Sequence, residues 1–172
     1  MGEVRLNATN TASRSPGVRL LAVYLNDHLA GSTTVLELVR RASREHADTE
    51  LGSFFSRLAV EVSEDRQALR RVMALAGARP QWAKIALAWL AEKAGRFKLN
   101  GRLLRRSALS PLIELETAET GIYGKMLLWQ VLREQRPPGS SAVDLDDLIA
   151  RAQRQVAGVE RRRLGAGAAL GM

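Results

Sequence analysis

The chain has 172 residues, enough for one domain with a full hydrophobic core, and its apolar share of 46% and charged share of 26% are typical of folded globular proteins. It contains no cysteine, which excludes disulfides, thiolate zinc sites and cysteine nucleophiles. The formal net charge of +8 comes mainly from scattered arginines that no nucleic-acid-binding motif accompanies. We interpret it as a solvated basic surface, with charge-driven DNA binding as an alternative.

Two long helices follow a polar N-terminal tail. Residues 1–14 are rich in Asn, Thr and Ser and are expected to be disordered. A serine and a proline at 15–16 supply an N-cap and a first helical position. From there, apolar residues recur at alternating spacings of three and four as far as Ala42, which is the pattern of one helix face. The same spacing predicts a second helix over 51–76, which ends at Gly77.

Three further helices are expected in the second half of the chain. A shorter third helix is predicted over 81–99, and a second Ser-Pro pair at 110–111 opens a fourth. The run Pro-Pro-Gly at 137–139 is a strong stop signal. Ser141 followed three residues later by Asp144 is typical of a capping box and predicts a fifth helix.

These elements predict an all-α protein. Long helices joined by short breaks favour antiparallel neighbours, so we expect a four-helix bundle over residues 15–136. Residues 137–164 are expected to form a linker and an additional amphipathic C-terminal helix, packed on the bundle or on a partner. The Gly/Ala-rich residues 165–172 are expected to be a flexible tail.

Several polar residues lie on the predicted inner faces of the helices. Burying such groups without partners costs on the order of several kcal/mol, so each should be paired. Our first interpretation is a buried polar network that fixes the register of the helices. Its predicted members are His28, Ser32, Asp65, Glu92, Lys93, Arg96 and Glu119.

The alternative interpretation is a metal site within the bundle. Carboxylates and an imidazole facing one another inside helices suit iron or manganese. The predicted ligands are His28, Asp65, Glu61, Glu116 and Glu119.

Three stretches of the chain are similar to a bacterial subgroup of the ferritin-like superfamily. They are YLNDHLAGST (24–33), AEKAGRFKLNGRL (91–103) and SPLIELETAETGIYGKMLLW (110–129), and the resemblance covers about residues 16–136. It implies a ferritin-like antiparallel four-helix bundle.

The resemblance also implies how the family's metal site would look here. Di-iron members carry a Glu on each of two helices and Glu-x-x-His on each of the other two. This chain offers Glu61-x-x-Glu64 and Glu116-x-x-Glu119, without the histidine, and places His28 where the family has a glutamate. We therefore expect a degenerate di-iron site.

From these observations we expect a non-catalytic binding or stress-associated protein that acts on an unknown protein partner or as a homodimer, without a cofactor. The alternative is an oxidoreductase or iron-handling protein that uses iron or manganese in a rebuilt site. No signal pattern opens the chain and no apolar run could span a bilayer, so a cytoplasmic protein without membrane contact is expected.

Overall fold

The computed structural model describes residues 15–81 and 109–168. All regular structure within these residues is helical, which confirms the expected all-α class for this part of the chain. The predicted helix over 81–99 lies outside the described residues except for its first residue, and so does the expected tail over 1–14. The elements are α1 (Pro16–Glu45), α2 (Glu50–Leu75), α4 (Ser110–Gln135), the short 3-10 helix η1 (Ser140–Ala142) and α5 (Leu145–Gly167).

Local signals explain where three of the helices begin. Pro16 opens α1 as predicted. Thr49 caps α2, because its hydroxyl accepts a hydrogen bond from the amide of Gly52 at 3.0 Å. At α5 the predicted capping box is displaced: Asp144 is itself the N-cap and accepts from the amide of Asp147 at 3.0 Å, whereas Ser141 lies in η1.

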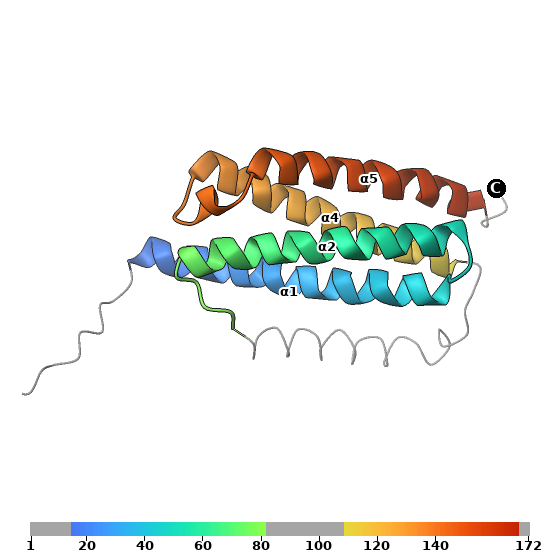
Figure 1. The fold of residues 1–172 in the computed structure, drawn as a ribbon, viewed down its shortest axis with the longest axis horizontal. Coiled ribbons are helices and arrows are strands. Elements are labelled where there is room, and N and C mark those ends of the chain that lie inside the picture. Colours follow the sequence, from blue (N-terminus) through green and yellow to red (C-terminus); the bar gives the residue numbers. More distant parts are fainter. Residues whose placement is uncertain (1–14, 82–108, 169–172) are drawn as a thin grey trace, which may run out of the picture.

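The four long helices of residues 15–81 and 109–168 lie side by side as two antiparallel pairs (Figure 1). α1 packs against α2, and α4 against α5, while α1 also contacts α4 and α2 contacts α5. The connection between α4 and α5 passes over the end of α2, where Gly139 has a φ of 88° and a Cβ would lie 2.5 Å from the carbonyl oxygen of Val72. Figure 1 also shows that α2 ends at the opposite end of the assembly from the start of α4.

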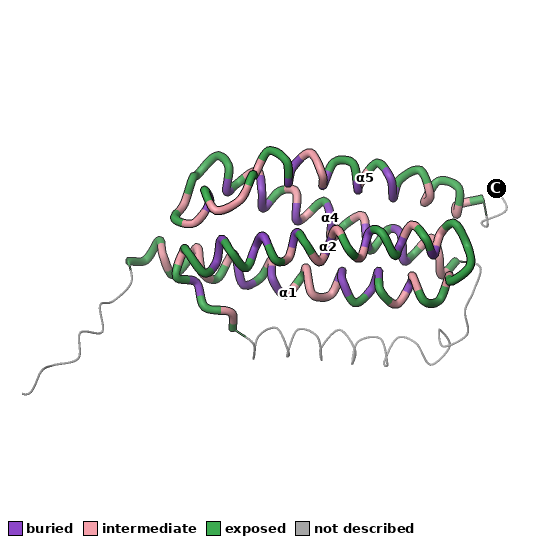
Figure 2. The backbone as a smooth tube through the Cα atoms, viewed as in Figure 1, coloured by how far each residue is buried: buried purple, intermediate pink, exposed green. Residues whose placement is uncertain are grey.

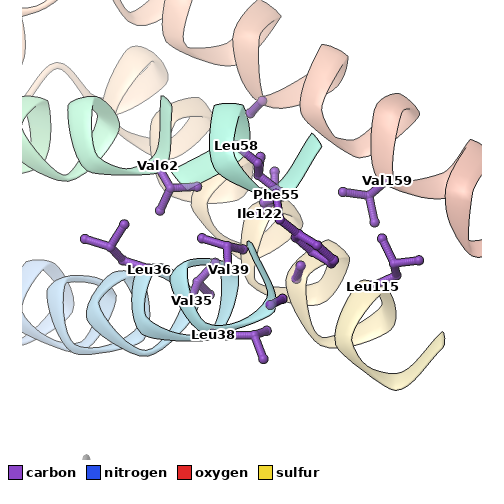
Figure 3. Close-up of a cluster of buried hydrophobic side chains, with 13 residues drawn as sticks. Val35, Leu36, Leu38, Val39, Phe55, Leu58, Val62, Leu115, Ile122 and Val159 are labelled. Carbon is purple, nitrogen blue, oxygen red and sulfur yellow. The ribbon is translucent and has the colours of Figure 1, made fainter. Parts of the chain in front are cut away.

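The helices bury two hydrophobic clusters, one toward each end, and the buried faces point inward along all four helices (Figure 2). The first contains Leu25, Met73 and Trp129, and the second surrounds Phe55, which is completely buried (Figure 3). α5 contributes to both clusters. The expected C-terminal helix is present, and it forms one wall of the core of the described residues.

A buried asparagine holds the chain as it leaves α2. The Nδ2 group of Asn26 donates to the carbonyl oxygens of Ala22 at 2.8 Å and of Arg79 at 3.2 Å. Its Oδ1 atom accepts from the amide of Gln81 at 2.8 Å. All three bonds lie at a side chain that is 2% exposed, so this contact ties the segment after α2 to the middle of α1.

Among the described helices, none is long and apolar enough to cross a membrane.

Close packing at the first turn of α2 yields a stability prediction. A Cβ atom at Gly52 would lie 2.0 Å from the carbonyl oxygen of His46, which is backbone and cannot easily move aside. We expect Gly52→Ala to lower the free energy of unfolding by about 1 to 3 kcal/mol, measured by urea denaturation. The matched control is Gly31→Ala, where a Cβ has open space and the substitution should stabilise by about 1 kcal/mol. Equal effects of the two substitutions would contradict the packing argument.

Candidate functional site

The centre of the protein contains a buried ion pair between α2 and α4. Asp65 is 1% exposed and Lys125 is 8% exposed. The Lys125 ammonium forms an ion pair with Oδ2 of Asp65. From α5, Arg151 donates to Oδ1 of the same carboxylate at 3.4 Å. Both oxygens of Asp65 are therefore occupied by cations, which is what a buried carboxylate requires.

Gln155 of α5 completes this cluster. Its Oε1 atom accepts from the Lys125 ammonium at 2.6 Å, and its Nε2 group donates to Glu61 at 2.9 Å and to Asp65 at 3.3 Å. The amide thus joins α5 to α2 and α4 at one level. Burial lowers the pKa of Lys125, while the neighbouring Asp65 carboxylate opposes that shift. We call these four residues and Arg151 the central polar cluster.

A cavity of about 840 Å³ lies beside the central polar cluster, between α1, α2 and α4; we call it the interhelical cavity. Mostly apolar surface lines it. It reaches the protein surface, because exposed residues such as Gly31 and Thr120 also line it. Its polar and charged lining residues are Tyr24, Asp27, His28, Ser32, Thr34, Asp65, Arg66, Glu116, Thr117, Thr120 and Lys125.

Two neighbouring side chains of α1 face this cavity without a hydrogen bond to the described residues. Tyr24 and His28 are one turn apart, and their rings meet edge to face with centroids 4.6 Å apart. Burial lowers the pKa of His28, and the nearby Asp27 carboxylate only partly opposes this. Burial therefore favours the uncharged form of His28.

Glycines leave room for the cavity. A Cβ at Gly31 of α1 or at Gly124 of α4 would have nothing within 4 Å. Both residues line the cavity and both lie in helix interiors, where glycine is less favourable than alanine by about 1 kcal/mol. At Gly121, by contrast, a Cβ would lie 2.2 Å from a methyl group of Val35, so this glycine permits α1 and α4 to approach.

The structure separates the residues predicted as metal ligands. Asp65 is bound by cations, and Glu61 accepts from Gln155. Glu119 is half-buried and pairs with Arg163 at 3.0 Å, while Glu116 is exposed at the cavity. In residues 15–81 and 109–168, no three Asp, Glu, His or Cys side chains lie close enough together to hold a metal ion. Among the described residues, the predicted ligands are therefore not gathered at one point.

Of the predicted members of the polar network, Asp65 is buried and paired, but its partners are residues outside the predicted set. His28 lies at the cavity, and the Ser32 hydroxyl donates to the Leu29 carbonyl of its own helix at 2.8 Å. Glu119 pairs with Arg163 away from Asp65's partners. The remaining predicted members, Glu92, Lys93 and Arg96, lie outside the described residues.

Sequence reasoning missed Lys125, Gln155 and Arg151. Lys125 and Gln155 could have been found by the pattern that identified Asp65, which is a polar residue at a position where the helical spacing predicts a buried one. Lys125 lies three residues after buried Ile122, and Gln155 three residues after buried Ala152. Met126 on α4 and Val156 on α5, each one position further along, are apolar and suggested a different inner face.

A second buried polar contact lies where α1 ends and α4 begins. His46 Nε2 lies 2.8 Å from a carboxylate oxygen of Glu114, and both side chains are largely buried. The imidazole stacks on Phe55 with ring centroids 6.0 Å apart. Burial raises the pKa of Glu114, while His46 acts in the opposite direction. This pair joins the end of α1 to the start of α4 and lies outside the lining of the cavity.

Breaking the central ion pair should strongly destabilise the protein. Lys125→Met leaves the Asp65 carboxylate and the Gln155 carbonyl without their shared buried donor, so we expect a loss of about 3 to 5 kcal/mol in urea denaturation. The control is Arg133→Met, which removes an exposed pair with Asp146 and should cost below about 1 kcal/mol. Similar losses in both variants would show that the buried pair has no special role.

The lowered pKa of His28 makes stability depend on pH. Below its ordinary value of 6.5 the unfolded chain binds more protons than the folded one, so unfolding becomes easier as the pH falls through this range. The melting temperature should therefore drop less between pH 7.5 and 5.5 in His28→Gln than in the native chain. Parallel pH profiles for the two proteins would contradict this.

Compared with known proteins, the chain shows no match: no protein-family model, no curated protein and no solved structure is similar to it at a significant level.

Proposed function

We propose that this protein is a non-catalytic binding protein that holds a small organic molecule in the interhelical cavity. One observation carries the proposal: a mostly apolar cavity of about 840 Å³ that reaches the surface between three helices. Small-molecule sites in proteins generally have volumes of about 300 to 1,000 Å³ and are lined mainly by apolar side chains with a few polar groups. We further propose a ferritin-like bundle with a degenerate di-iron site as its scaffold.

Several polar groups at the cavity already have partners, which supports a binding function over a catalytic one. The charges of Asp65 and Lys125 neutralise each other, and Gln155 occupies a further hydrogen of the ammonium. The Ser32 hydroxyl is directed to a backbone carbonyl of its own helix. The His28 imidazole at the cavity has no hydrogen bond to the described residues, so His28 and Ser32 do not form an activated nucleophile there.

The glycines support a cavity that is kept open. Two helix-interior positions on its lining, Gly31 and Gly124, carry no side chain although there is space for one. Larger residues there would fill the cavity with apolar atoms and raise helix propensity at the same time. Stability alone therefore disfavours glycine at both positions, and room for a ligand accounts for it.

Filling the cavity provides the test. We expect the uncharged dye Nile red to bind the native protein saturably, with a fluorescence increase that reports an apolar site. Gly124→Leu places a side chain into open space at the cavity lining, so it should weaken dye binding at least about tenfold without lowering the melting temperature.

The matched control is Gly165→Leu in α5, where a Cβ also has open space but the residue does not line the cavity. This variant should bind the dye like the native protein. If the native protein does not bind, or if Gly124→Leu binds as well as Gly165→Leu, the cavity is not a binding site.

A further inference from the structure

The interhelical cavity is elongated along the helix axes. Its lining extends from Tyr24 to Val35 on α1 and from Glu116 to Trp129 on α4. At 1.5 Å per residue these stretches are roughly 16 to 20 Å long. A compact molecule would leave much of such a volume empty, whereas a chain-like molecule would fill it.

The body of the cavity is apolar. Val35, Val62 and Leu69 line it from α1 and α2, and Ile122 and Leu128 line it from α4. Burying an alkyl chain against these side chains contributes about 0.8 kcal/mol for each methylene removed from water. The lining thus favours an aliphatic body.

Arg66 gives the lining a positive charge that no described carboxylate cancels. Its Nε group donates to the Thr33 hydroxyl at 3.2 Å, and within residues 15–81 and 109–168 no carboxylate oxygen lies within 4.0 Å of its guanidinium. Burial lowers the pKa of Arg66, and so do the nearby guanidinium groups of Arg70 and Arg40, while Glu37 opposes this weakly. A negative charge beside Arg66 would offset the repulsion between these guanidinium groups.

The other charged groups on the lining are less suited than Arg66 to bind an anion. Lys125 already faces Asp65. Asp27 and Glu116 are exposed, so water and salt screen their repulsion of an anion, whereas Arg66 is partly buried and screened less. Arginine also binds carboxylates through two parallel N–H groups, and the terminal nitrogens of Arg66 have no hydrogen bond to the described residues.

We infer that the ligand is an elongated aliphatic carboxylate, with its alkyl chain in the interhelical cavity and its head group on the Arg66 guanidinium. This inference rests on the proposed function, since it requires the cavity to be a binding site. It adds the chemical class of the ligand and the residue that selects it.

Two probes of equal length test the inference by isothermal titration calorimetry, below the critical micelle concentration of the acid and below the solubility limit of the alcohol. Dodecanoate should bind the native protein at least about tenfold more tightly than dodecanol. In Arg66→Gln the affinity for dodecanoate should fall to that for dodecanol, while the affinity for dodecanol stays within about twofold. Arg66→Lys, which keeps the charge but not the paired donors, should retain part of the preference.

The control is Arg133→Gln, which removes an exposed cation that does not line the cavity and should leave both affinities unchanged. Equal binding of acid and alcohol by the native protein would overturn the carboxylate inference but leave the cavity as a binding site, provided that Gly124→Leu blocks both. A preference for the acid that persists in Arg66→Gln would overturn the role of Arg66. If neither probe nor Nile red binds, the proposed function fails as well.

Discussion

The ion pair between Asp65 and Lys125 is the constraint on which the rest of the structure depends. A charge at this depth is tolerated only when its partner and its remaining hydrogen bonds are in place. The partners come from three helices: the carboxylate from α2, the ammonium from α4, and Arg151 and Gln155 from α5. A shift of any of these helices by one residue would leave a buried charge or amide unpaired. Apolar clusters tolerate such shifts far better, so the polar contacts define the register.

The central polar cluster and the interhelical cavity lie next to each other, at the level of Asp65 and Lys125 along the helices. The cluster attaches α5 to α2 and α4, while on the other side of Asp65 and Lys125 the wall of α1 carries His28 and Ser32 instead of large apolar side chains. Val35 contacts Gly121 and holds α1 against α4 beyond this layer. Small and polar residues in the middle thus leave space that the two hydrophobic clusters do not fill. An open volume framed by packed helices is what the proposed binding of a small molecule requires.

Much of the secondary structure could be predicted because apolar spacing and Ser-Pro signals are local. Asp65 was identified because it interrupts an apolar face in the sequence. Lys125 and Gln155 were missed because Met126 and Val156 offered a competing inner face one residue away. On α4 this ambiguity is physical: Leu127 and Val131 are apolar yet exposed, so the helix is apolar on several sides. The location of α5 could not be predicted, since an amphipathic pattern does not tell which surface covers it.

The order of the helices has a consequence for the kinetics of folding. α1 with α2, and α4 with α5, are neighbours both in sequence and in space, so each pair can form through contacts of short sequence separation. Asp65 and Lys125 are 60 residues apart, and their pairing requires the two hairpins to have met. Bringing the two residues together costs loop-closure entropy, and the ion pair can offset this cost only after it has formed. The charged pair can form only when the two hairpins meet in the correct alignment, so it discriminates against misaligned packing of the two halves.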